Sequence, residues 1–138
     1  MEANMKKTLM QGLFACGLLL GASAVQAQLA VVMGPNGAPI SKDILANLYL
    51  GRSFEFKAID LPEGSPMRDH FYKKLTDRDP AQVKAVWARV VFTGKGQAPL
   101  MLPDAESIKK AVATDPKAIG YIDKSAVDSS VKVVFTID

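Results

Sequence analysis

Apolar residues along this chain follow two patterns, one typical of strands and one typical of helices. Residues 29–33 (LAVVM) are apolar without interruption, which predicts a strand buried on both faces, and the turn-forming stretch GPNGAP follows. Two short strands close the chain. The last, residues 130–138, has the alternation of a strand with one better-buried face: one set is Val131, Val133, Phe135 and Ile137, and the other is Lys132, Val134, Thr136 and Asp138. Between these ends only FKAID, residues 56–60, has the pattern of a strand.

Four further segments have the three-to-four-residue apolar spacing of helices. The residues expected to cap the first three are Ser41, Ser65 and Asp79, and the fourth is expected to begin at Pro103-Asp104. The clearest inward stripe belongs to the third helix and consists of Val83, Val86, Trp87, Val90 and Val91. Gly94 and Gly96 are expected to end that helix. Strands separated by helical segments predict the α/β class, as a single domain with a central mixed sheet covered by helices.

The first 27 residues have the composition of a secretory signal peptide. Lys6 and Lys7 form a basic start, an apolar run covers residues 9–24, and the small-x-small pattern VQA follows. A membrane anchor is the alternative, but the run is shorter than the roughly 20 residues that span a bilayer. We therefore expect cleavage after residue 27 and a periplasmic domain, residues 28–138, without a membrane span.

The single cysteine, Cys16, lies inside this expected leader. Its lipidation instead of its removal is the alternative, although the bulky Phe14 stands where a lipoprotein signal has a small residue. Removal of the leader leaves no thiol and therefore no disulfide, so burial alone must hold the domain together. The net charge of the whole chain, +3, is too small to indicate a nucleic-acid partner.

The polar residues do not form a pattern typical of an enzyme. The only histidine, His70, follows Asp69 inside an expected helix, where adjacent side chains diverge by about 100° and cannot form a relay. No His, Cys and carboxylate spacing typical of a metal site is present. The stretch TGKGQAP lacks the spacing of a phosphate-binding P-loop. We therefore expect no catalytic residues, no cofactor and no metal.

The stretch PEGSPMRDHFYKK, residues 62–74, is the best candidate for a binding site. A helix start offers unpaired backbone N–H groups and the positive end of the helix dipole, and both favour an anion. The residues that would form this site are Gly64, Ser65, Met67 and Arg68. Pro66 removes one of the donors. Capping of the helix without any ligand explains the same residues and stays open as the alternative.

Four stretches together resemble the periplasmic phosphate-binding component of bacterial ABC transporters, and more closely the short exported domains that are similar to phosphate-binding proteins. The resemblance covers most of residues 32–134. It implies an α/β domain equivalent to one lobe of a type II periplasmic binding protein, whose full form closes two lobes over an anion. The stretches are NLYLGR (47–52), PEGSPMRDHFYKKL (62–75), AQVKAVWARVVFTGKGQAP (81–99) and AIGYID (118–123).

The resemblance implies phosphate contacts for only part of the family's motif. In the full-length proteins a serine-glycine-threonine helix start, with an arginine four residues before the serine, grips phosphate. Ser65 matches the serine, and Arg68 matches an arginine often found after the motif. Leu61 stands at the position of the earlier arginine, and Pro66 and Met67 stand at those of the glycine and threonine. The hydroxyl-rich loop of the other lobe has no counterpart, since GPNGAP contains neither serine nor threonine.

Two functions therefore stay open. The first is an accessory to phosphate uptake that binds phosphate, another oxyanion or a phosphorylated envelope molecule at residues 64–68, completed by a second copy of the chain. It predicts saturable binding that is lost when Ser65 and Arg68 are both replaced by alanine. The second is a non-catalytic interaction module that has lost the ligand site and docks another envelope protein. It predicts a stable complex without oxyanion binding.

Overall fold

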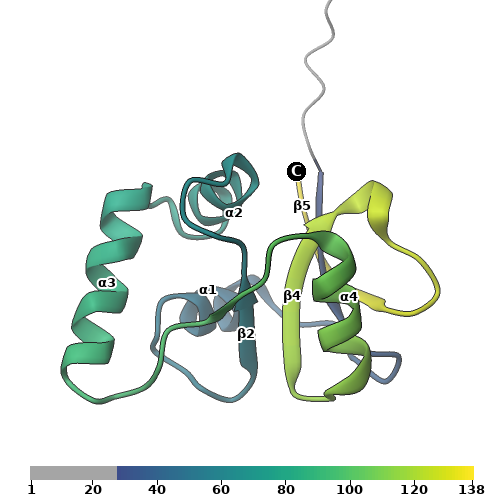
Figure 1. Ribbon diagram of the computed structural model, residues 1–138, viewed down its shortest axis with the longest axis horizontal. Helices are drawn as coiled ribbons and strands as arrows, with labels where there is room; N and C mark the ends of the chain where they lie inside the picture. Colours follow the sequence, from purple (N-terminus) through teal and green to yellow (C-terminus); the bar gives the residue numbers. More distant parts are fainter. Residues whose placement is uncertain (1–27) are drawn as a thin grey trace, which may run out of the picture.

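A computed structural model describes residues 28–138, which form one five-stranded sheet with helices packed against it (Figure 1). The expected leader, residues 1–27, and with it Cys16, lies outside the described residues. In chain order the elements are β1 (Leu29–Met33), α1 (Lys42–Tyr49), β2 (Lys57–Asp60), α2 (Pro66–Thr76), α3 (Pro80–Phe92), β3 (Leu100–Met101), α4 (Ala105–Thr114), β4 (Ala118–Asp123), a 3₁₀ turn (Lys124–Ala126) and β5 (Lys132–Ile137). None of the helices within these residues is long and apolar enough to cross a membrane.

The sheet is mixed, as the sequence predicts, with the strand order β3-β2-β4-β1-β5. Strand β2 runs parallel to β3 and β4, whereas β1 runs antiparallel to β4 and β5. All five residues of β1 are buried, because this strand has a neighbour on each side and is covered on both faces. The uninterrupted apolar run at residues 29–33 thus has the structure expected of it.

Neighbouring residues of β4 show how the helices are divided between the two faces of the sheet. Side chains alternate along a strand, so Gly120 and Tyr121 face opposite sides. A Cβ atom on Gly120 would lie 2.7 Å from Cγ2 of Ile108, so the absence of a side chain lets α4 pack closely on this face. On the other face the Tyr121 ring stacks on Phe71 of α2, with ring centroids 3.7 Å apart. Helix α4 therefore covers one face, and α2 covers the other.

The three predicted helix caps are confirmed, and Asp104 caps the fourth helix. In each, a side-chain oxygen accepts a hydrogen bond from the backbone N–H three residues later, and α3 has a complete capping box formed with Gln82. The caps are Ser41, Ser65, Asp79 and Asp104. Trp87 is buried, as expected, and its indole N–H donates to the backbone oxygen of Tyr49 at 3.0 Å.

Three details of the predicted pattern differ from the structure. Val91 is half-exposed, because the buried stripe of α3 stops at Val90 in the helix's last turn. Gly94 ends α3 in a left-handed conformation, whereas Gly96 has another role: a Cβ atom there would lie 2.3 Å from the Phe54 ring. In β5 the alternation breaks at Val134, which is buried because the register between β1 and β5 shifts by a bulge at this point.

Candidate functional site

Three strands end at the same edge of the sheet, because β2, β3 and β4 run parallel. Helix α2 begins shortly after β2, and helix α4 begins shortly after β3, so the amino ends of both helices face this edge. A small hollow of about 210 Å³ lies there. Residues that line it include Leu61, Ser65, Met67, Asp104, Tyr121 and Asp123. In open α/β sheets the carboxyl edge is the usual position for a ligand.

The amino end of α2 offers this hollow several hydrogen-bond donors. Ser65 Oγ accepts from the Arg68 N–H at 3.3 Å, which leaves the hydroxyl hydrogen of Ser65 free to donate elsewhere. Within residues 28–138, the backbone N–H groups of Gly64 and Met67 have no hydrogen-bond acceptor. Gly64 has a φ of 91°, which a residue with a side chain rarely adopts, so glycine is needed to turn the chain into the helix.

Two carboxylates that line the hollow, those of Asp104 and Asp123, repel an anion. Hydrogen bonds from the backbone and the hydroxyl of Ser107 lower the pKa of Asp104, and those of Ser125 lower the pKa of Asp123. Both groups are therefore ionised at neutral pH. An oxyanion that keeps a proton, and can donate it to a carboxylate, suits this hollow better than a fully ionised one.

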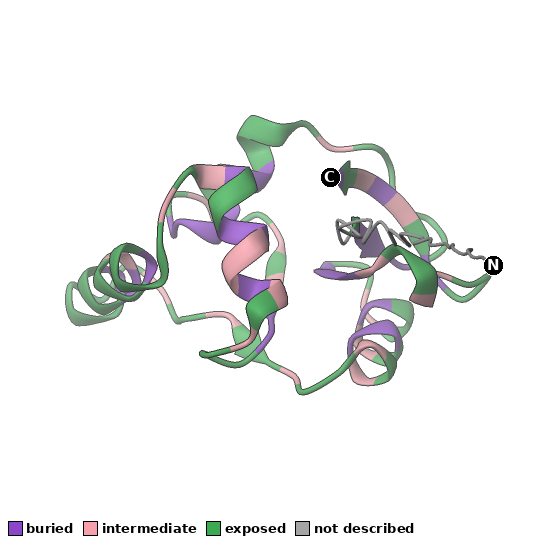
Figure 2. Cartoon of the chain, turned by 90° about the horizontal axis from the view of Figure 1, so that it is seen from above, coloured by how far each residue is buried: buried purple, intermediate pink, exposed green. Residues whose placement is uncertain are grey.

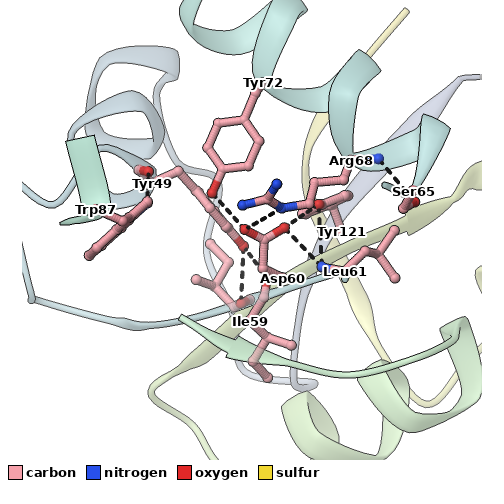
Figure 3. A network of polar contacts seen from close by, with 10 residues as sticks. Tyr49, Ile59, Asp60, Leu61, Ser65, Arg68, Tyr72, Trp87 and Tyr121 are labelled. Atoms are coloured by element: carbon pink, nitrogen blue, oxygen red, sulfur yellow. Dashed lines mark hydrogen bonds and ion pairs between the residues drawn. The ribbon is translucent and has the colours of Figure 1, made fainter. Parts of the chain in front are cut away.

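Arg68 does not line the hollow, although the sequence places it beside Ser65. Its side chain turns under α2 into the protein, where Nε lies 3.3 Å from Oδ2 of Asp60 and the guanidinium carbon lies 5.1 Å from the centre of the Tyr72 ring (Figure 3). Only 5% of Arg68 is exposed. Burial lowers the pKa of Arg68, but the charge of Asp60, the interaction with its carboxylate and the two neighbouring tyrosines, Tyr72 and Tyr121, together raise it overall.

Asp60 is the centre of a buried polar network that the sequence analysis did not predict. Its carboxylate is fully buried and accepts hydrogen bonds from Tyr72 Oη at 2.6 Å, from the Leu61 N–H at 2.8 Å and from the Tyr121 hydroxyl (Figure 3). Together with Arg68, these donors satisfy a carboxylate that would otherwise be costly to bury. The network joins the end of β2 to the first turn of α2, and so fixes the helix start that faces the hollow.

The buried tyrosines keep their protons. Burial, and next to it the charge of Asp60, raises the pKa of Tyr49, Tyr72 and Tyr121 far above that of a free tyrosine. Tyr49 points its hydroxyl at two backbone oxygens, those of Ile59 at 2.8 Å and Ile119 at 3.3 Å. These neutral hydroxyls act as hydrogen-bond donors within the core, and they are structural rather than reactive groups.

The sequence contained a signal for this network. Asp60 stands between Ile59 and Leu61 at the end of a predicted strand, and an acidic residue flanked by apolar ones in a strand is unusual. Nothing in the sequence, however, shows which donors would surround it, because Tyr121 lies 61 positions further along the chain. Within residues 28–138, no group of three or more His, Cys, Asp or Glu side chains is placed to hold a metal ion.

The fold is similar to those of two solved proteins. One is an ABC-type phosphate transport receptor from Vibrio cholerae, with a TM-score of 0.58 and 18% identity over 78% of this chain and 46% of that one. The other is a putative phosphate ABC transporter substrate-binding protein with bound phosphate from Clostridium perfringens, with a TM-score of 0.58 and 20% identity over 78% of this chain and 45% of that one. No protein-family model matches the chain. No curated protein sequence matches it significantly.

The predicted resemblance is confirmed at the level of the fold. The chain has the α/β architecture of a lobe of a phosphate-binding protein, and it spans about half the length of the two solved proteins. Both neighbours are named for binding and transport, and neither is named as an enzyme. At this identity the likeness shows the fold alone, so the ligand must be argued from the residues of this chain.

Proposed function

We propose that this chain is a periplasmic, non-catalytic binding domain that binds phosphate or a similar oxyanion weakly at the amino end of α2, as an accessory to phosphate uptake. The observation that carries the proposal is the pair of free backbone donors, Gly64 and Met67, beside the Ser65 hydroxyl. Ser65 and Met67 line a hollow at the carboxyl edge of the sheet, and Gly64 directly precedes Ser65. The solved neighbours of this fold include a protein with bound phosphate.

The residues of this proposed site have different roles. Gly64 and Met67 donate backbone N–H groups to the anion, and Ser65 donates its hydroxyl hydrogen. Arg68 would have to leave Asp60 to reach the anion, at the cost of a buried, uncompensated carboxylate. We therefore assign Arg68 to positioning: its ion pair holds the first turn of α2 in place.

A single lobe explains why the binding should be weak. Pockets for small ligands usually bury most of the ligand's surface, whereas this chain supplies one wall of such a site. Each hydrogen bond from the helix start contributes only about 0.5 to 3 kcal/mol, and the carboxylates of Asp104 and Asp123 subtract from the total. A second copy of the chain or another envelope protein that covers the hollow would complete it.

Replacing Ser65 with aspartate is expected to weaken phosphate binding at least roughly tenfold, because a negative charge would then stand at the anion's position. Aspartate caps a helix as well as serine does, so α2 should still form. Isothermal titration with phosphate, with sulfate as the competing anion, measures total binding, and the amide chemical shifts of Gly64 and Met67 in the same titration give the affinity of this site. The matched control is Ser41→Asp, the same change at the cap of α1, which should bind like the unaltered protein. Equal affinities of Ser65→Asp and the unaltered protein would exclude the site.

The second candidate function is a non-catalytic interaction module. It is favoured by apolar side chains exposed at the β3 edge of the sheet, where Leu100 is 61% and Met101 is 41% exposed. An edge strand also presents unpaired backbone groups to another chain. If phosphate gives no heat at millimolar concentration, while a complex with an envelope protein is lost on Leu100→Lys, this function replaces the first.

A further inference from the structure

We propose that the chain has a second, separate anion site, formed by a basic hollow between the end of α1 and the last turns of α3, and that this site takes a phosphate group. The hollow has a volume of about 250 Å³. The basic residues that line it are Arg52, Arg78, Arg89 and Lys95. It shares no lining residue with the hollow at the start of α2. The proposal is therefore independent of the function proposed above.

The backbone holds these cations in place at the ends of helices. Arg52 follows the end of α1, and its N–H donates to Asn47 O at 2.8 Å. The preceding residue, Gly51, has a φ of 71°, and a Cβ atom there would lie 2.7 Å from Val90 Cγ2, so glycine lets this turn lie directly against α3. Lys95 is held by its N–H, which donates to Val90 O at 3.1 Å. Residues far apart in the sequence are thus brought to the two sides of one hollow.

Arg78 has a donor that the described chain does not satisfy. It lies in the turn between α2 and α3, after Asp77, which ends α2 in a left-handed conformation with a φ of 58°. The Nε atom of Arg78 is buried, and within residues 28–138 it has no hydrogen-bond acceptor. A buried polar group without a partner is costly and marks a place where an ion or a water completes the structure. Arg78 lines the basic hollow, so a rotation of its side chain would bring this donor to an oxyanion bound there.

Among residues 28–138, no carboxylate neutralises these charges. None of the residues that line the hollow is acidic, and none of the ion pairs among residues 28–138 involves its four cations. The acidic neighbours of Arg78 are engaged elsewhere: Asp77 pairs with Lys73 at 3.1 Å, and Asp79 accepts from the Gln82 N–H at 2.9 Å. Like charges gathered in one hollow repel one another, and a bound anion removes this repulsion.

The helix dipole can explain why a single cation lies near a helix end, but not why four cations line one hollow. A positive side chain near the carboxyl end of a helix gains about 0.3 to 1 kcal/mol, whether or not other cations are near. The negative end of the α3 dipole would also repel an anion, but hydrogen-bond donors satisfy carbonyl oxygens in the last turn of α3. Thr93 Oγ1 donates to Arg89 O at 2.9 Å and to Val90 O at 3.2 Å, and the Gly94 N–H donates to Val91 O at 3.1 Å. The field in the basic hollow is therefore set by the cations.

A phosphate group fits the shape and charge of this hollow. Arginine presents its N–H groups as a planar fork that matches two phosphate oxygens, and three of the four cations are arginines. The volume lies below the range of about 300 to 1,000 Å³ typical of pockets that enclose a whole organic ligand. The hollow thus suits a phosphate group, either free phosphate or the end of a phosphomonoester whose remainder lies outside. Arg52, Arg89 and Lys95 are exposed, so the remainder of a larger ligand can lie in solvent; Figure 2 shows α3 as the leftmost helix, with much of its surface exposed.

Amide chemical shifts in a titration of the protein made from the full chain test this site separately from the start of α2. Inorganic phosphate should shift the amides of Arg52 and Lys95 in a saturable way. The double variant Arg52→Gln, Arg89→Gln should bind at least roughly tenfold more weakly at these amides. Both arginines are exposed, so the protein should remain folded. The Ser65→Asp variant should leave this titration unchanged, so failure of either site is visible without the other.

The controls decide between a specific site and general attraction. The variant Lys74→Gln, Lys110→Gln removes the same charge from two exposed positions outside both hollows and should bind as the unaltered protein does. Glycerol phosphate as a second probe distinguishes the sources: tighter binding than inorganic phosphate indicates a monoester. If the amides of Arg52 and Lys95 do not move with either probe, or if the lysine variant loses as much affinity as the arginine variant, the proposal is wrong.

Discussion

Replacing Asp60 with asparagine is expected to lower the free energy of unfolding by about 3 to 5 kcal/mol, as measured by urea denaturation. The amide has nearly the shape of the carboxylate, so the loss would come from charge and hydrogen bonding. It leaves the buried guanidinium of Arg68 without a counter-charge, and its NH₂ group points a donor at hydroxyls that donate in the native protein. A loss of this size is a large part of the stability of a small domain.

The matched control is Glu63→Gln, which makes the same chemical change three residues away. Glu63 lies 3.8 Å from Lys84, and both side chains are largely exposed, so this surface ion pair should contribute less than about 1 kcal/mol. If Asp60→Asn destabilises the protein no more than Glu63→Gln does, then Asp60 is not the buried centre described above. Recovery of stability in the double variant Asp60→Leu, Arg68→Met would indicate that the unpaired charge causes the loss.

This buried pair also bears on the proposed binding site. Arg68 is the third residue of α2, and its backbone N–H is the one that Ser65 caps. The ion pair with Asp60 therefore ties the helix start, with its free donors, to the end of β2. A binding site whose donors come from the backbone needs such a support, because the backbone has to be held at the correct angle before the anion arrives.

The sequence predicted the elements of this fold well because their signals are local. Caps such as Ser65 and Asp79 act within three residues, and the apolar stripe of α3 repeats within one helix. The errors lie where distant contacts decide the outcome. Gly96 is small because Phe54 covers it, and Val134 is buried because β5 bulges against β1. Neither partner can be identified from the residues near these positions.

The same distinction explains what the sequence showed of the candidate sites. The helix start at Ser65 was found because a cap and a turn adjoin each other in the chain. The direction of the Arg68 side chain was not found, because it depends on Asp60, a residue of another element. The basic hollow was missed altogether, since Arg52, Arg78 and Lys95 follow three different helices and form no motif. Only the packing of those helix ends brings the charges together.

Raising the pH above about 10 is expected to unfold the protein steeply, because all three tyrosines of the chain are buried with raised pKa values. Below pH 10 the tyrosines are neutral in both states, and their burial contributes its full stability. Above pH 10 the unfolded chain releases these protons while the folded chain retains them, so stability falls as pH rises. Three protons correspond to a slope of about 4 kcal/mol per pH unit.

Tyrosinate absorbance, followed together with circular dichroism, measures this directly. The absorbance of ionised tyrosine should appear only as helical signal is lost, since no tyrosine ionises in the folded protein. Tyr49→Phe leaves the hydrogen bonds to Asp60 in place and removes one titrating group, so the slope should fall by about 1.4 kcal/mol per pH unit. Tyrosinate absorbance that rises near pH 10 while the helical signal is intact would contradict the buried network, because at least one hydroxyl would then be open to solvent.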